Sequence, residues 1–115
     1  MILTEFFDTV NLNEGDLNHT YKKNQFINSI EFYQEQDISS FNIAIIGVGE
    51  DRNSISNQGS CLAPNQVRKY LYQLIGFNNR PKIIDLGNFK IGATVNDTYF
   101  ALSSILEDLI KNNVI

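Results

Sequence analysis

One six-residue stretch constrains the fold more than any other part of the chain. Residues 43–48 read Ile-Ala-Ile-Ile-Gly-Val, an apolar run without alternating polar side chains. A strand with one face in water alternates between polar and apolar residues, whereas a strand covered on both faces is apolar throughout. The run therefore predicts a strand of a parallel sheet whose two faces are both covered.

A helix is predicted after the connection that follows this strand. Pro64 stands where a helix can begin without losing a hydrogen bond, and Gly76 stands where a left-handed residue would end it. Apolar side chains between them recur at helical spacing, which predicts a stripe that faces the core. The stripe consists of Val67, Tyr70, Leu71, Leu74 and Ile75. The opposite, polar face consists of Asn65, Gln66, Arg68, Lys69 and Gln73.

A second strand and a second helix come next. Residues 82–86, Lys-Ile-Ile-Asp-Leu, are typical of another buried strand. Thr94 and Asp97 have the spacing of a capping box, with Asp in place of the preferred Glu. The core-facing side chains of this helix are expected to be Leu102, Ile105, Leu106, Leu109 and Ile110. Because Val114 and Ile115 begin a further apolar run, the order of elements predicts βαβ units and a parallel sheet.

The first 40 residues have weaker patterns. Apolar residues in segment 2–10 are spaced for one face of a short helix, namely Ile2, Leu3, Phe6, Phe7 and Val10. Residues 29–33 suggest a strand, with a helical turn as the alternative. We expect residues 1–40 to form an N-terminal extension that packs on a domain made of residues 41–115.

Composition and charge narrow the classes of partner. The 115-residue chain has 43% apolar residues and a formal net charge of −4, with nine Lys and Arg against 13 Asp and Glu. Binding to nucleic acid or to an anionic membrane requires a basic surface, so neither partner is expected. A single cysteine excludes an intrachain disulfide and fits a cytoplasmic protein. The first residues lack the basic region of a signal peptide.

Two connections are long and have no apolar periodicity. Residues 49–63 follow the first buried strand, and residues 87–94 follow the second. Ligands of open parallel sheets bind outside the carboxyl ends of the strands, and both connections start at such ends. We therefore expect the two connections to lie side by side on one rim, which is the predicted functional edge.

A few side chains near this rim could contact a ligand. Glu50, Asp51 and Arg52 are adjacent charges that could bind a zwitterionic or guanidinium-like substrate, or form the internal ion pairs of a solvated turn. Asn57 could contact the substrate or brace the loop. These four are the candidate substrate-binding residues. Asp85 could accept hydrogen bonds from loop N–H groups or face a site.

Two other kinds of site are disfavoured. Residues 47–49, Gly-Val-Gly, begin like the dinucleotide fingerprint G-x-G-x-x-G, but Arg52 occupies the third glycine position. His19 is the only histidine and Cys61 the only cysteine, so the sequence contains no cluster of metal ligands and no Cys with a neighbouring His. No metal ligand and no catalytic residue is therefore assigned within the chain.

Several motifs follow one another in residues 41–115. The first strand ends in Ile-Gly-Val, and Gly59 and Pro64 precede a helix that carries Arg68. The second strand ends in the Asp-x-Gly-Asn pattern of residues 85–88, and the next helix carries Asp-Thr-Tyr-Phe-Ala-Leu at residues 97–102. In their order and spacing, these motifs resemble the ureohydrolase family of arginases, agmatinases and formimidoylglutamases.

The resemblance implies a three-layer α/β fold of the arginase/deacetylase-like kind, with a parallel central sheet that is incomplete in this chain. For a full-length protein it implies two manganese ions and hydrolysis of a C–N bond in a linear amidine or guanidine, of the arginine, agmatine or formimidoylglutamate type. The family's ligand motifs, Gly-Gly-x-His, Asp-x-His-x-Asp and Ser-x-Asp-x-Asp, are absent here. This part alone is therefore expected to be inactive and to hold no metal.

The resemblance also bears on partners. The partner of the full-length protein would be a small-molecule substrate, and an open sheet edge would allow copies of the chain to associate into a homo-oligomer. The competing interpretation is a non-enzymatic α/β interaction or regulatory domain, complete as it stands.

Overall fold

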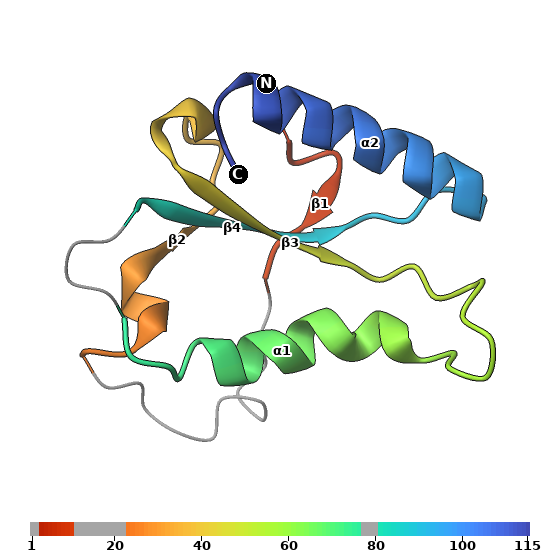
Figure 1. The fold of residues 1–115 in the computed structure, drawn as a ribbon, viewed down its shortest axis with the longest axis horizontal. Helices are drawn as coiled ribbons and strands as arrows, with labels where there is room; N and C mark the ends of the chain where they lie inside the picture. Colours follow the sequence, from red (N-terminus) through yellow and green to blue (C-terminus); the bar gives the residue numbers. More distant parts are fainter. Residues whose placement is uncertain (1–2, 11–22, 77–80) are drawn as a thin grey trace.

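The structure is a computed structural model, and it describes residues 3–10, 23–76 and 81–115. These residues form a mixed sheet of four strands, and α1 and α2 lie on opposite sides of it (Figure 1). The elements are β1 (Phe7–Asp8), η1 (Phe26–Ser29), β2 (Ile30–Phe32), η2 (Ile38–Ser40), β3 (Ile43–Val48), η3 (Ser60–Leu62), α1 (Ala63–Leu71), β4 (Ile83–Phe89) and α2 (Val95–Lys111). The predicted α/β class is confirmed, while Ile2 and His19 lie outside the described residues.

Strand β4 lies at the centre of the sheet. β3 runs parallel to it along one edge, with Ile43 opposite Ile83. Along the other edge, β2 runs parallel to the first half of β4 and β1 runs antiparallel to its end. The strand suggested for residues 29–33 is thus present as β2. Parallel pairing is confirmed for β2, β3 and β4, but an entirely parallel sheet is wrong because β1 runs the other way.

The N-terminal segment joins the sheet as a strand, so the helix predicted for residues 2–10 is wrong. Phe7 is buried and packs edge-to-face on Phe89, with the ring centroids 5.4 Å apart. Leu3 is also buried, and its N–H donates to the hydroxyl of Tyr33 at 3.0 Å. After a single turn at residues 4–6, pairing with the end of β4 buries Phe7 in a strand rather than in a helix, and such tertiary contacts outweigh the local spacing.

A β-bulge in β4 decides which of its side chains face α1. The register shifts between Ile45 and Ile46, so that β4 contains one more residue than the stretch of β3 beside it. An additional residue reverses the alternation of side chains after it. Asp85 and Asn88 are three positions apart, and yet both hydrogen-bond to α1. Gly87, with a φ of 95°, lies between them.

Two hydrophobic clusters hold the helices against the sheet. In the cluster on the α2 face, Ile105 and Leu109 are buried as predicted and Leu102 packs at the margin, whereas Leu106 and Ile110 are exposed. The buried members of this cluster are Leu3, Phe7, Tyr33, Ile38, Phe41, Ile84, Leu86, Phe89, Ile105, Leu109 and Val114. The cluster on the α1 face is smaller and consists of Phe26, Ile30, Tyr72 and Ile83.

Helix α1 turns the polar side chain of Arg68 toward the sheet, so most of its predicted apolar stripe does not face the core, although Leu71 is half-buried and packs there as predicted. Arg68, expected on the polar face, is 2% exposed, whereas Val67 and Tyr70 of the predicted stripe are 60% and 66% exposed. The helix also ends before Gly76, which does not have the positive φ of the predicted cap. The cause of this orientation is Asp85 on the facing strand, because its buried carboxylate requires a cationic partner.

The last residue of the chain lies against the outer edge of β3, the edge away from β4. The N–H of Ile115 donates to the carbonyl of Asn42 at 2.9 Å, and the N–H of Ala44 donates to the carbonyl of Ile115 at 2.8 Å. This pair of bonds is the pattern of two parallel strands, with Ile115 beside Ile43. The apolar run predicted to begin at Val114 and Ile115 therefore starts in register with the sheet.

Candidate functional site at the carboxyl ends of β3 and β4

The connections that follow β3 and β4 lie on the same side of the molecule, at the right of Figure 1. The guanidinium of Arg52 joins them: Nη1 donates to the carbonyl of Ala93 and Nη2 to the carbonyl of Gly92, both at 2.9 Å. The predicted neighbourhood of the two connections is therefore confirmed. Because β4 extends to Phe89, the second connection is residues 90–94 rather than 87–94.

Glu50 holds Arg52 in place at the start of the first connection. Its carboxylate pairs with the Arg52 guanidinium, with 2.8 Å between Nε and Oε2. The same carboxylate accepts a hydrogen bond from the hydroxyl of Thr98 at 3.0 Å. The hydrogen bonds from Arg52, helped by the one from Thr98, outweigh desolvation and lower the pKa of Glu50 to about 2. The carboxylate is therefore ionised and already has a cationic partner.

The first turn of α2 hydrogen-bonds to both connections through Thr98. The hydroxyl of Thr98 accepts a hydrogen bond from the N–H of Gly92 at 2.8 Å, which fixes the second connection. The predicted capping box is confirmed, since the hydroxyl of Thr94 accepts from the N–H of Asp97 and the carboxylate of Asp97 accepts from the N–H of Thr94, each at 3.1 Å. Thr98 was not predicted from the sequence as part of the site, and only its place one residue after the capping box pointed to this position.

Asp51 points into the first connection itself. Its carboxylate accepts hydrogen bonds from the N–H groups of Gly59 at 2.7 Å and Cys61 at 3.2 Å. The bond from Gly59 and then those from Cys61 lower the pKa of Asp51, and the same carboxylate raises the pKa of the Cys61 thiol. Asn57 is exposed in the same loop. Asp51 thus braces the loop, while Asn57 faces water.

A shallow hollow of about 450 Å³ opens on the outer side of this loop. Arg52 is the candidate substrate-binding residue that lines it, together with Asn53, Ser54, Ile55, Ser56 and Gln58. The structure therefore brings Glu50 and Arg52 together. It directs Asp51 to a different set of partners, and Asn57 is not among the residues that line the hollow.

A buried ion pair lies beneath the rim, between α1 and β4. Arg68 Nε donates to Asp85 Oδ2 and Arg68 Nη2 to Asp85 Oδ1, both at 2.9 Å. Nη2 also donates to the carbonyl of Gly87 at 3.0 Å, and Nη1 donates to the side-chain oxygens of Asn65 and Asn88. All five N–H groups of the guanidinium therefore have an acceptor. Asp85 therefore accepts hydrogen bonds within the fold, from Arg68 and from the N–H of Gly87, and these contacts support the predicted structural role rather than the alternative of facing a site.

Tyr72 completes this buried network. Its hydroxyl donates to Asp85 Oδ2, and its side chain is fully buried. Burial, and then the hydrogen bond to Asp85, raise the pKa of Tyr72, so the hydroxyl keeps its proton. Burial alone would lower the pKa of Arg68, but its hydrogen bonds to Asp85 outweigh burial and the pKa is raised. The network is therefore a protonated phenol and a fixed pair of opposite charges.

Gly47 in β3 lets α1 approach closely enough for this network to form. A Cβ at this position would lie 2.0 Å from Asn88 Oδ1 and 2.7 Å from the Cβ of Pro64. Both distances are far below van der Waals contact, so any side chain would push α1 away from the sheet. The first glycine of the incomplete dinucleotide fingerprint therefore serves helix–sheet packing here.

The described residues do not fit a centre of two manganese ions. No group of three or more His, Cys, Asp or Glu side chains comes together in ranges 3–10, 23–76 and 81–115. Glu50 and Asp51, which are hard oxygen donors of the kind that manganese prefers, already accept hydrogen bonds from within the chain. We therefore assign no metal ligand to these residues.

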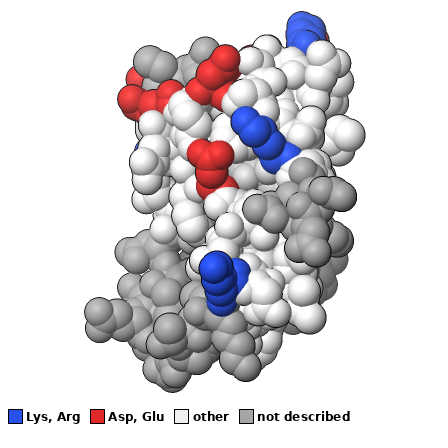
Figure 2. Space-filling view, turned by 90° about the vertical axis from the view of Figure 1, so that its left-hand side faces the viewer, with Lys and Arg blue, Asp and Glu red and all other residues white. Residues whose placement is uncertain are grey.

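The side of the molecule away from the rim carries both kinds of charge. Figure 2 shows that the Lys and Arg side chains visible there lie apart from one another and share the surface with Asp and Glu side chains. Within the described ranges, neither α-helix has the length and apolar character that a membrane span requires. The expectations about nucleic acid and membrane surfaces remain predictions.

Comparison with known proteins returned no relative. No protein-family model matches the chain, and no curated protein or solved structure matches it.

Proposed function

We propose that the chain forms the first part of a ureohydrolase, a metal-dependent enzyme that in its full length hydrolyses the C–N bond of a linear amidine or guanidine. The proposal starts from the motifs of residues 41–115 and their order. It assigns to this chain the opening of the sheet and one side of the active-site mouth. The finer arrangement, a three-layer arginase/deacetylase-like fold, and a cytoplasmic location belong to the same proposal.

The observation that carries the proposal is the junction of the two rim connections by Arg52. Parallel strands place their carboxyl ends at one edge, and this is where α/β enzymes bind their ligands. The connection after β3 is long and irregular, but hydrogen bonds of Glu50, Arg52 and Thr98 fix its start against the second connection. Such a fixed rim loop supports a role in binding rather than a passive link.

The chain's own residues would act at the mouth of the site. Arg52, 36% exposed and lining the hollow, would meet the carboxylate or polar end of a substrate, with Glu50 setting the direction of its guanidinium. Asn57, exposed on the same loop, would offer an uncharged hydrogen-bonding group. Asp51 would keep the loop in shape through its bonds to Gly59 and Cys61.

The two manganese ions belong to the full-length protein in this proposal. When bound, such a pair activates a bridging water for attack on the amidine or guanidine carbon. Since the described residues do not fit a metal centre, the chain contributes scaffold and mouth and no step of the reaction.

A direct test uses the full-length protein. The reading frame beyond codon 115 is expected to encode the Gly-Gly-x-His, Asp-x-His-x-Asp and Ser-x-Asp-x-Asp motifs. The purified, manganese-loaded protein is expected to release urea from arginine or agmatine, or formamide from formimidoylglutamate. The 115-residue chain is expected to release neither product. Arg52→Ala should raise KM several-fold, with Asn53→Ala as the matched control from the same hollow. A stop codon after Ile115, or a manganese-loaded protein inactive on all three substrates, would refute the proposal.

A second function, a non-enzymatic interaction domain, is favoured by one observation. Val67 and Tyr70 on one side of α1, and Leu74 shortly after the helix, are all more than half exposed. An apolar helix face of this kind fits a protein partner. The two proposals differ in the residues encoded after codon 115, because an interaction domain has no need of the metal-binding motifs.

A further inference from the structure

The outer edge of β3 is paired at its start and free further along. Ile115 occupies the edge at Asn42 and Ala44 through its two backbone hydrogen bonds. Because backbone groups that point to one side recur at every second residue of a strand, the N–H groups of Ile46 and Val48 point to the same edge as that of Ala44. Among the described residues, no strand lies beside this part of β3. An open edge of this kind accepts another strand.

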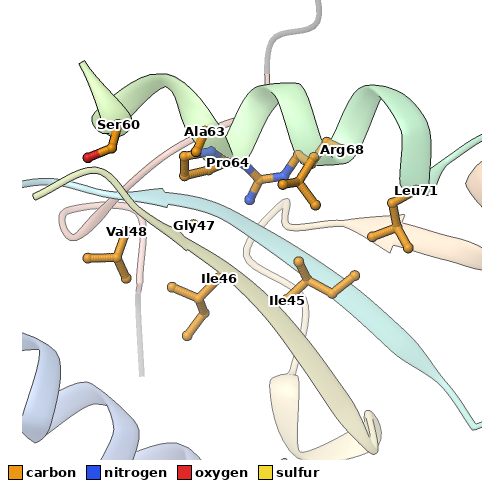
Figure 3. A pocket seen from close by; sticks show the side chains of 10 residues that line it. Ile45, Ile46, Gly47, Val48, Ser60, Ala63, Pro64, Arg68 and Leu71 are labelled. Carbon is orange, nitrogen blue, oxygen red and sulfur yellow. The ribbon is translucent and has the colours of Figure 1, made fainter. Parts of the chain in front are cut away.

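An apolar groove runs along this free edge. It has a volume of about 310 Å³ and lies between β3 and α1. Figure 3 shows Ile45 on the side of β3 that faces α1, with Leu71 and Pro64 above the strand. The charged side chain in the lining is that of Arg68, and all of its N–H groups already have acceptors. The groove therefore suits an uncharged, apolar occupant.

We propose that this groove and edge form an acceptor site for one further strand, which continues from Ile115 parallel to β3. The pairing of Ile115 fixes the direction and the register of that strand, so neither has to be assumed. The inference rests on the proposed function, in which this chain is the first part of a longer protein. It names the element that completes the sheet next to the rim.

The register defines what the acceptor strand must contain. Ile115 lies beside Ile43, so the second residue after Ile115 lies beside Ile45 and the fourth beside Gly47. Paired residues of parallel strands point to the same face, and Ile43 and Ile45 belong to the α1 face. The second and fourth residues therefore point to the α1 face, into the groove beside Ile45 and Gly47. The strand ends beside Val48, at the same rim as Glu50.

The alternation of Val114 and Ile115 agrees with this register. Val114 is buried in the cluster on the α2 face, whereas the side chain of Ile115 is 90% exposed. Consecutive side chains of a strand point to opposite faces. Ile115 therefore points to the α1 side of the sheet, where its side chain is exposed.

Hydrogen exchange of four amides tests the proposal. The 115-residue chain is compared with two versions that carry five additional residues, Val-Ile-Val-Ile-Val or Val-Pro-Val-Pro-Val. The first can pair, whereas proline at the second and fourth positions removes the required N–H groups. With the first extension, exchange of Ile46 and Val48 is expected to slow by about tenfold. Ile45 and Gly47 point to β4 and serve as the internal reference, with no change expected.

Several outcomes would overturn the proposal. Equal exchange of Ile46 and Val48 in all three chains would show that no strand is accepted. Equal slowing of Ile46 and Val48 exchange by both extensions would show that the added residues shield these amides without pairing as a strand. Protection in the unextended chain together with a dimer in light scattering would assign the edge to a second copy.

If the extended chain aggregates, the same five residues are added as a separate peptide with a lysine tail, and unchanged exchange of Ile46 and Val48 then counts against the proposal. Because no metal or substrate is present, a failure here leaves the ureohydrolase proposal to its own test.

Discussion

Replacement of Arg68 by methionine is the sharpest test of how α1 is held to the sheet. The substitution removes the cation but keeps a long side chain, so it leaves the Asp85 carboxylate buried with the Tyr72 hydroxyl and the Gly87 N–H as its remaining donors. Arg68 and Asp85 are 2% and 1% exposed, so water cannot replace the lost donors. The expected result is a large loss of stability rather than the small loss typical of a surface charge.

The magnitude follows from the bonds that are lost. Two charge-assisted hydrogen bonds join Arg68 to Asp85, and at about 1.5–3 kcal/mol each they give a loss of about 3–6 kcal/mol. Removal of one partner of a buried ion pair costs about 3–5 kcal/mol in other proteins, which agrees with this range. Such a loss is a large share of the roughly 5–15 kcal/mol that a domain typically has.

Urea unfolding followed by circular dichroism measures this loss. With an m-value of about 1–3 kcal/mol/M, the midpoint of Arg68→Met should fall by at least about 1 M. Lys69→Met, which removes a positive charge from the next position of α1 without touching Asp85, is the matched control and should change the free energy of unfolding by less than about 0.5 kcal/mol. Tyr72→Phe keeps the ion pair and removes one hydrogen bond, so it should cost about 1.5–3 kcal/mol and remain measurable if Arg68→Met does not fold.

A double-mutant cycle separates the ion pair from the rest of the network. Asp85→Leu combined with Arg68→Met removes both charges, and the double variant should be less destabilised than the sum of the two single variants by more than about 1 kcal/mol. If the losses add without coupling, or if Arg68→Met costs no more than Lys69→Met, then the buried pair does not hold α1 to the sheet.

Two further predictions concern the rim and the bulge. Because the pKa of Glu50 is lowered from 4.5 to about 2, its ion pair with Arg52 stabilises the fold above pH 4.5 and is lost as the pH falls from 4.5 towards 2. The difference in stability between the wild-type chain and Glu50→Gln, measured by urea unfolding, should therefore shrink over this range, with Glu107→Gln as an exposed control; a constant difference would contradict the assignment. Gly87→Ala should lower the free energy of unfolding clearly more than Gly59→Ala. Both glycines have positive φ, so both substitutions strain the backbone. A Cβ at Gly87 would also lie 2.0 Å from the carbonyl oxygen of Asp8, whereas a Cβ at Gly59 would meet nothing within 4 Å. The strain shared by both is about 1–2 kcal/mol, and equal losses in thermal or urea unfolding would show that contact with β1 is unimportant.

The sequence by itself determined the elements whose pattern is local. The bounds of β3 and the capping box of α2 follow from an uninterrupted apolar run and from the spacing of Thr94 and Asp97, and both signals lie within a few residues of the element that they define. The meeting of the two connections also followed, since parallel strands place their carboxyl ends together whatever the side chains are. Of the candidate site, the placement of Glu50 and Arg52 at one rim was accessible in this way.

The tertiary structure alone decided which face of α1 packs inward. Helical spacing identified an apolar stripe, but Arg68 turns the helix so that its polar face meets Asp85, and the stripe around Val67 remains exposed. That choice depends on a carboxylate 17 positions away and on a bulge that brings Asn88 to the same face, so no local pattern contains it. The direction of β1 was decided in the same way, because only pairing with β4 tells an apolar strand from an apolar turn of helix.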